Sequence, residues 1–248
     1  MAIIEFQKIL KRTDAKALLL LSLWPAIFSV ATWLSPTIYN YTGKVSAVHF
    51  ANQQILIHSG ALLPLVLIVY MASLSFYQEL VEKQIYLYKD IPRAKILKSK
   101  YFSLYGTYFL FLISYILMTF LFYFLIFNKT AGATGNFVEH QEELIPMIYD
   151  SFQIIIGFLF YMHIGISFAL RFSPGVSVFL TLFAYLFIKT MPTISWAKFL
   201  TPVGYREIIP FNENSLMYTL IISMTVFMIY NIIFYLLNKR YFLKKDFN

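Results

Sequence analysis

The sequence predicts an all-α integral membrane protein with six transmembrane helices, in a single transmembrane domain that covers residues 1–248. Hydrophobic residues make up 59% of the chain and charged residues only 13%, whereas a soluble domain carries about a quarter charged residues. The apolar residues fall in blocks, and a bilayer-spanning helix needs about 20 of them. Lysines and arginines flank these blocks instead of forming one stripe, which is typical of membrane orientation and not of nucleic-acid binding.

The first sixteen residues predict an amphipathic helix. Four apolar residues recur there at helical spacing, with cations on the other faces: Ile3, Phe6, Ile9 and Leu10. We expect this helix, residues 1–16, to lie along the cytoplasmic leaflet. A plain basic flank of the first span is the alternative.

Six spans are expected after this helix. Pro25 and Pro64 fall inside the first two and should bend them, because proline lacks the N–H that a helix needs. Only Ser173 and Pro174 separate the fourth span from the fifth, which predicts a tight hairpin. The expected spans are residues 17–34, 57–77, 101–127, 151–172, 175–191 and 216–237.

The distribution of lysine and arginine predicts the orientation. Fifteen of these residues fall on the side of the two termini and five on the other, which places both termini in the cytoplasm. The segment 192–215, on the outer side, is too apolar for an ordinary loop. We expect either a re-entrant helical piece or an interfacial loop anchored by aromatic residues.

Residues 78–100 form the long polar segment on the basic side. The segment begins with Glu79 and Glu82, and its apolar and aromatic positions include Tyr86. It turns at Asp90-Ile91-Pro92-Arg93 and ends in three lysines, Lys95, Lys98 and Lys100. We expect a short helix under the membrane that ends before Pro92. Its outward apolar residues would need a partner to pack against.

Catalytic and metal-binding signatures are missing from the sequence. It has no G-x-x-x-x-G-K-[ST] loop, no G-x-S-x-G turn, no paired histidines and no cysteine. We therefore expect no catalytic residue, no metal and no cofactor bound by this chain. The polar exceptions within the spans are Gln153, His163 and Asn231, which predict either a cargo path or polar contacts between helices.

This architecture resembles an ABC type-2 transporter permease. The resemblance covers the whole chain as architecture, and its motif lies in the loop between spans two and three. In that family the loop typically reads as an acidic residue, a hydrophobic helix, a Pro/Ser/Arg turn and a lysine that opens span three. Here these positions are Glu79, residues 80–88, Asp90-Ile91-Pro92-Arg93 and Lys100.

The resemblance implies a bacterial plasma-membrane exporter subunit, multi-pass and without its own ATPase. Two such permeases, identical or different, would pair with two cytoplasmic ABC ATPase subunits that hold ATP and Mg. The implied cargo is an amphipathic or hydrophobic peptide, toxin or antibiotic, with export or immunity as the role. The implied coupling residues, which would contact the ATPase, are Glu79, Glu82, Tyr86, Asp90, Pro92 and Arg93.

Two other classes of function stay open at this point. An intramembrane enzyme acting on lipids or membrane peptides would need clustered His, Asp or Glu near one interface. An ion-coupled carrier would keep carboxylates inside its spans.

Overall fold

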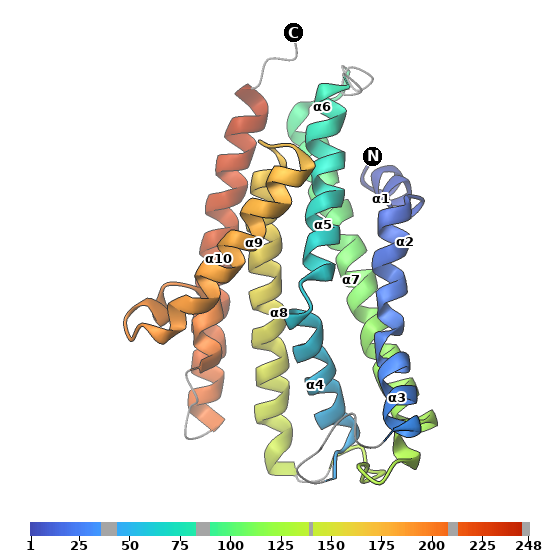
Figure 1. Cartoon of the computed structure of the whole chain (residues 1–248). Helices are drawn as coiled ribbons and strands as arrows, with labels where there is room; N and C mark the ends of the chain where they lie inside the picture. The colour runs from blue at the N-terminus through green and yellow to red at the C-terminus, as the bar shows by residue number, and fades with distance from the viewer. Residues whose placement is uncertain (36–43, 83–89, 139–140, 208–212, 245–248) are drawn as a thin grey trace.

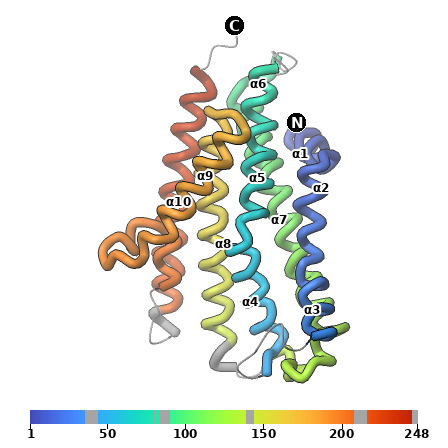
Figure 2. The backbone as a smooth tube through the Cα atoms, in the orientation of Figure 1, coloured from blue at the N-terminus to red at the C-terminus, as the bar shows by residue number. Residues whose placement is uncertain are grey.

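The computed structural model describes residues 1–35, 44–82, 90–138, 141–207 and 213–244 as a bundle of helices (Figures 1 and 2). In these ranges, five helices are long and apolar enough to cross a membrane, or six if the bent pair α4–α5 counts as one span. The all-helical class predicted by the sequence is therefore confirmed, and the long apolar helices are compatible with a membrane protein. The start of α1 and the last described residues of α10 (Glu213–Lys244) lie at the same end of the bundle as α6 (Figure 1).

The N-terminal helix α1 (Ala2–Leu10) is shorter than the predicted 1–16. The chain leaves the helix at Lys11, and Arg12 is extended before α2 (Thr13–Leu20) begins. α1 packs on α7 (Arg93–Leu125), where the ring of Phe6 lies over Gly106. Because a Cβ at position 106 would come within 3.2 Å of that ring, glycine allows the close approach.

The first span continues from α2 through a 3₁₀ turn (Leu21–Leu23) into α3 (Trp24–Leu34). Pro25 sits in the first turn of α3, where its missing N–H has no intrahelical partner to lose. The helix type changes just before Pro25, and Thr13–Leu34 counts as one continuous span, so the bend expected at Pro25 stays a prediction.

The second span differs from the predicted 57–77. Helix α4 (Ala47–Gly60) begins ten residues earlier and is bent by 52° from the following helix, Leu63–Gln78. The break lies at Leu62, which has a left-handed φ of 50°, directly before Pro64 in the first turn of α5 (Leu63–Ser73). A π-helical turn (Leu74–Gln78) then leads into α6 (Glu79–Val81).

The third span starts earlier than residue 101, because α7 begins at Arg93 directly after Pro92. The three lysines predicted to end a loop therefore lie on the first turns of a helix. α7 ends near a 3₁₀ turn (Phe127–Lys129). There the hydroxyl of Tyr123 donates to the carbonyl oxygen of Val45 at 2.8 Å, which closes the end of the bundle away from the termini.

Helix α8 (Gln141–Ala169) is the central helix. It begins ten residues before the predicted 151, and it packs against α4, α5, α9 (Pro174–Thr190) and α10 (Glu213–Lys244). The span part of α8 is mostly buried, whereas that of α10 is mostly exposed. The short connection to α9 confirms the tight hairpin at Ser173-Pro174.

Three 3₁₀ turns connect α9 toward α10, and they lie beside the bundle instead of beyond its end (Figure 1). The turns are Met191–Thr193, Ala197–Phe199 and Pro202–Glu207. The hydroxyl of Tyr230, near the middle of α10, donates to the carbonyl oxygen of Leu200 at 3.0 Å. Both expectations for 192–215 stay predictions, and residues 208–212 lie outside the described ranges.

A close approach at Gly165 generates a stability prediction. A Cβ at this position of α8 would clash with Val69 on α5 and meet Thr181 on α9 at 3.2 Å. Gly165→Leu should therefore destabilise the bundle by about 1–3 kcal/mol, because the core cannot absorb the added volume. The measurement is the thermal midpoint in detergent, with Gly175→Ala as the control, since a Cβ at Gly175 meets nothing within 4 Å. Equal midpoints for the two variants would contradict this packing.

Candidate functional site

The predicted coupling segment is tied to the bundle by a buried ion network. Glu79 is buried, and its two carboxylate oxygens accept hydrogen bonds from Lys100 (2.5 Å) and Lys8 (2.6 Å). Lys100 has no exposed surface and also donates to the carbonyl oxygen of Ser75. Glu5 lies 4.0 Å from the Lys100 ammonium. The network thus joins α1, the α5–α6 connection and α7.

The balance of charge in this network keeps Glu79 ionised. Burial alone would raise the pKa of Glu79, but the ammonium groups of Lys100 and Lys8 outweigh burial and hold that pKa below its ordinary value. Lys100 needs Glu79 as a partner, because a buried ammonium without an opposite charge would have lost its hydration with nothing to replace it. The ring of Phe76, whose centroid is 5.7 Å from the Lys100 ammonium, adds a cation–π contact.

The other predicted coupling residues lie around this network. Glu82 and Asp90 are exposed, and the Gln78 amide donates to Glu82 at 2.5 Å. Pro92 precedes the first residue of α7, and Arg93 donates to the carbonyl oxygen of Leu243 on α10 at 3.1 Å. Tyr86 and most of the predicted 80–88 helix lie in residues 83–89, which are outside the described residues. The described part of the segment contains only the short helix α6.

Two of the three predicted polar residues of the spans come together. The Tyr105 hydroxyl on α7 lies 2.5 Å from Nδ1 of His163 on α8 and 3.4 Å from Oδ1 of Asn231 on α10. Nε2 of His163 is buried without a hydrogen-bond partner among the described residues. This cluster joins three helices, as polar side chains in membrane bundles commonly do.

Gln153 lies apart from this cluster. Its Oε1 accepts a hydrogen bond from Ser223 on α10 at 2.8 Å. It is buried on α8, ten residues before His163.

A second polar junction was not anticipated from the sequence. The amide of Asn238 on α10 donates to the Tyr101 hydroxyl at 2.7 Å and to the Ser167 hydroxyl at 2.8 Å. Arg171 donates to Oδ1 of Asn238 at 2.8 Å. The α8–α9 turn is thereby joined to α7 and α10 at the end that carries the termini.

The sequence also did not predict that Lys100 and His58 are buried inside the bundle. A signal for Lys100 exists in the sequence, because Ile96, Lys100 and Leu104 follow at intervals of four and share one buried helix face. His58 is enclosed by rings, with Phe158 at 4.8 Å and Phe111 at 5.2 Å between centroids. Its surroundings come from other helices, so no local pattern indicates them.

The described residues contain no group of three or more His, Asp or Glu side chains placed to hold a metal ion. In comparisons of this chain with protein-family models, curated proteins and solved structures, nothing matched. The functional argument therefore depends on the geometry and on the resemblance in the sequence.

The ion network predicts a non-additive response to mutation. Glu79→Gln leaves Lys100 buried with only the more distant Glu5, and should cost about 3–5 kcal/mol. Lys100→Met should cost less, because Glu79 keeps Lys8. The double variant should recover much of the stability lost in Glu79→Gln.

Thermal midpoints in detergent provide the measurement for this double-mutant cycle. Glu82→Gln is the matched control, because exposed pairs contribute about 0–1 kcal/mol. Strict additivity of the two single substitutions would show that Glu79 and Lys100 do not interact as described.

Proposed function

We propose that this chain is the transmembrane permease subunit of an ATP-driven exporter of the ABC type-2 class. It acts with separate cytoplasmic ATPase subunits, which hold ATP and Mg, and with a second permease, identical or different. It resides in a bacterial plasma membrane with both termini in the cytoplasm. The observation that carries the proposal is the position of α6 and the Asp90–Arg93 turn, at the same end of the bundle as α1. Glu79 of α6 is bonded there to Lys8 of α1 and Lys100 of α7.

In this mechanism, ATP binding closes the partner subunits, and their motion presses on residues 79–92. The buried ion network passes that displacement to α7 through Lys100 and to α1 through Lys8. Separating a buried pair costs several kcal/mol, so these elements move together instead of sliding apart. The cargo path then changes its access from one side of the membrane to the other.

The role of Glu79 in this proposal is to position the segment. Its carboxylate is occupied by Lys8 and Lys100, so direct contact with the ATPase falls to exposed residues such as Glu82 and Asp90. Exposed charges at the edge of an interface speed the association of two proteins and set their relative orientation.

The cargo is an amphipathic or hydrophobic molecule such as a peptide, toxin or antibiotic. The aromatic content of 19% gives the spans broad, weakly polar surfaces that suit such a molecule better than a small ion. The choice among these cargoes is by analogy with the family that the sequence resembles.

An intramembrane enzyme is the second candidate. The observation in its favour is His163, which is buried within a span, whose Nδ1 lies 2.5 Å from the Tyr105 hydroxyl, and whose Nε2 has no hydrogen-bond partner among the described residues. Activity of the purified chain on a lipid or peptide, without any ATPase, would favour this candidate over the transporter.

The first test of the proposal determines which side of the membrane residue 90 faces. Because the chain has no cysteine, Asp90→Cys and Lys44→Cys give clean single-site variants at opposite ends. A membrane-impermeant maleimide should label position 44 in intact cells and position 90 only in inverted vesicles. Labelling of position 90 from outside would overturn the proposed orientation.

Partner docking is the second test, using the tagged chain purified from its own host in mild detergent. A stoichiometric ATPase should co-purify, and Asp90→Lys should reduce its retention about tenfold by charge reversal at the contact. Lys44→Glu, an exposed change at the other end, should retain the ATPase fully. Transport by the chain with no ATPase present would contradict the proposal.

A further inference from the structure

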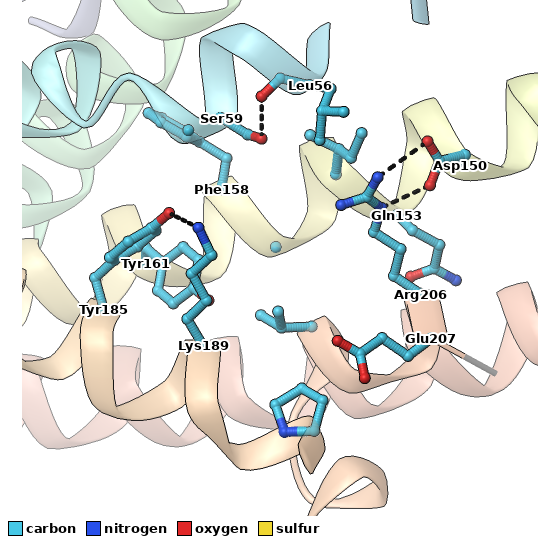
Figure 3. Close-up of a pocket in the computed structure, with 15 residues that line it drawn as sticks. Leu56, Ser59, Asp150, Gln153, Phe158, Tyr161, Tyr185, Lys189, Arg206 and Glu207 are labelled. Carbon is cyan, nitrogen blue, oxygen red and sulfur yellow. Dashed lines mark hydrogen bonds and ion pairs between the residues drawn. The ribbon is translucent and has the colours of Figure 1, made fainter. Parts of the chain in front are cut away.

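A cavity of about 520 Å³ opens beside α8, at the break between α4 and α5 (Figure 3). Its other walls are the end of α9 and the 3₁₀ turn Pro202–Glu207. The volume lies within the range of about 300–1,000 Å³ found for small-molecule sites. The floor is apolar and aromatic, formed by Ile154, Phe158, Tyr161 and Val203.

Two cationic groups and one carboxylate are available to a ligand in this cavity. Arg206 is held by Asp150 through hydrogen bonds of 2.6 and 3.3 Å, and its third guanidinium nitrogen points away from that carboxylate into the open space (Figure 3). The Lys189 ammonium donates to the Tyr185 hydroxyl at 3.2 Å and has no ion pair among the described residues. Glu207, at the exposed rim, has no ion-pair partner there either.

Asp150 itself is not available, because Asn52 on α4 and Arg206 both bond to it. The groups left open therefore match a ligand with one anionic and one cationic group. An anion alone would meet Glu207, and a cation alone would meet Lys189 and Arg206.

The charged groups lie near a boundary of the apolar layer. At 1.5 Å per residue, the distance along α8 from Asp150 to its end at Ala169 is about 30 Å, which equals the thickness of the hydrocarbon core. Trp196, on the connection between α9 and α10 that also carries Arg206, is exposed, and tryptophan is typical of such a boundary. Leu56, which lines the cavity, is 41% exposed, so apolar surface adjoins the cavity.

We propose that this cavity binds the headgroup of a zwitterionic phospholipid that carries a primary ammonium, of the phosphatidylethanolamine type. The phosphate is held by Lys189 and Arg206, the ammonium donates to Glu207, and the acyl chains leave past Leu56 along the apolar surface. This site does not depend on the exporter function proposed above. It would bind the same lipid in a protein of another class.

The experiment is native mass spectrometry of the full chain, delipidated in detergent and offered one lipid at a time. The probes are phosphatidylethanolamine, phosphatidylcholine and phosphatidylglycerol with the same acyl chains. The first should be retained about tenfold better than the second, because a quaternary ammonium cannot donate to Glu207. Equal retention of all three, or preference for phosphatidylglycerol, would overturn the proposal.

Three variants locate the effect. Glu207→Gln should remove the preference for phosphatidylethanolamine over phosphatidylcholine, and Lys189→Met should weaken retention of both about tenfold by loss of the phosphate contact. Lys198→Met is the matched control, because Lys198 lies over the ring of Phe199 and not at the cavity. Identical behaviour of the two lysine variants would contradict the site, provided that each elutes as one folded species.

Discussion

The contact between Lys100 and Glu79 is the constraint on which this structure depends most. An ammonium with no exposed surface has lost its hydration, a cost of several kcal/mol unless an opposite charge and hydrogen bonds replace the water. Glu79 supplies the charge and Ser75 supplies a carbonyl oxygen. Because Glu79 also bonds to Lys8, the start of α7, the end of α5 and the N-terminal helix are fixed relative to one another.

The two ends of the bundle are held by different kinds of contact. The end that carries the termini is joined by ions and charged hydrogen bonds, with Arg93 and Arg171 adding contacts to α10. The opposite end is closed by a hydrogen bond from Tyr123 to a backbone carbonyl and by rings around Phe50, whose centroid is 4.6 Å from that of Phe127, and the Asp150–Arg206 ion pair lies toward this end. The larger share of charged contacts therefore lies at the end that carries α6 and the start of α7.

Hydropathy predicted the membrane class, and α9 lies within one residue of its predicted limits at each end. It missed the start of α4, because Asn52 and Gln54 read as polar loop, although Gln54 is buried against other helices. His163 and Asn231 stood out as polar residues in apolar spans. Their meeting through Tyr105, like the pairing of Glu79 with Lys100, depends on which helices are neighbours, and no local pattern in one sequence carries that information.

Hydrogen–deuterium exchange of the purified chain, compared between the native protein and Glu79→Gln, tests the central claim most directly. The account predicts that α1 and the first turns of α7 lose protection together, although they are far apart in sequence, while α8 and α9 stay protected. Faster exchange confined to residues next to position 79, or no change in α1, would contradict the claim that this ion pair holds the end of the bundle together.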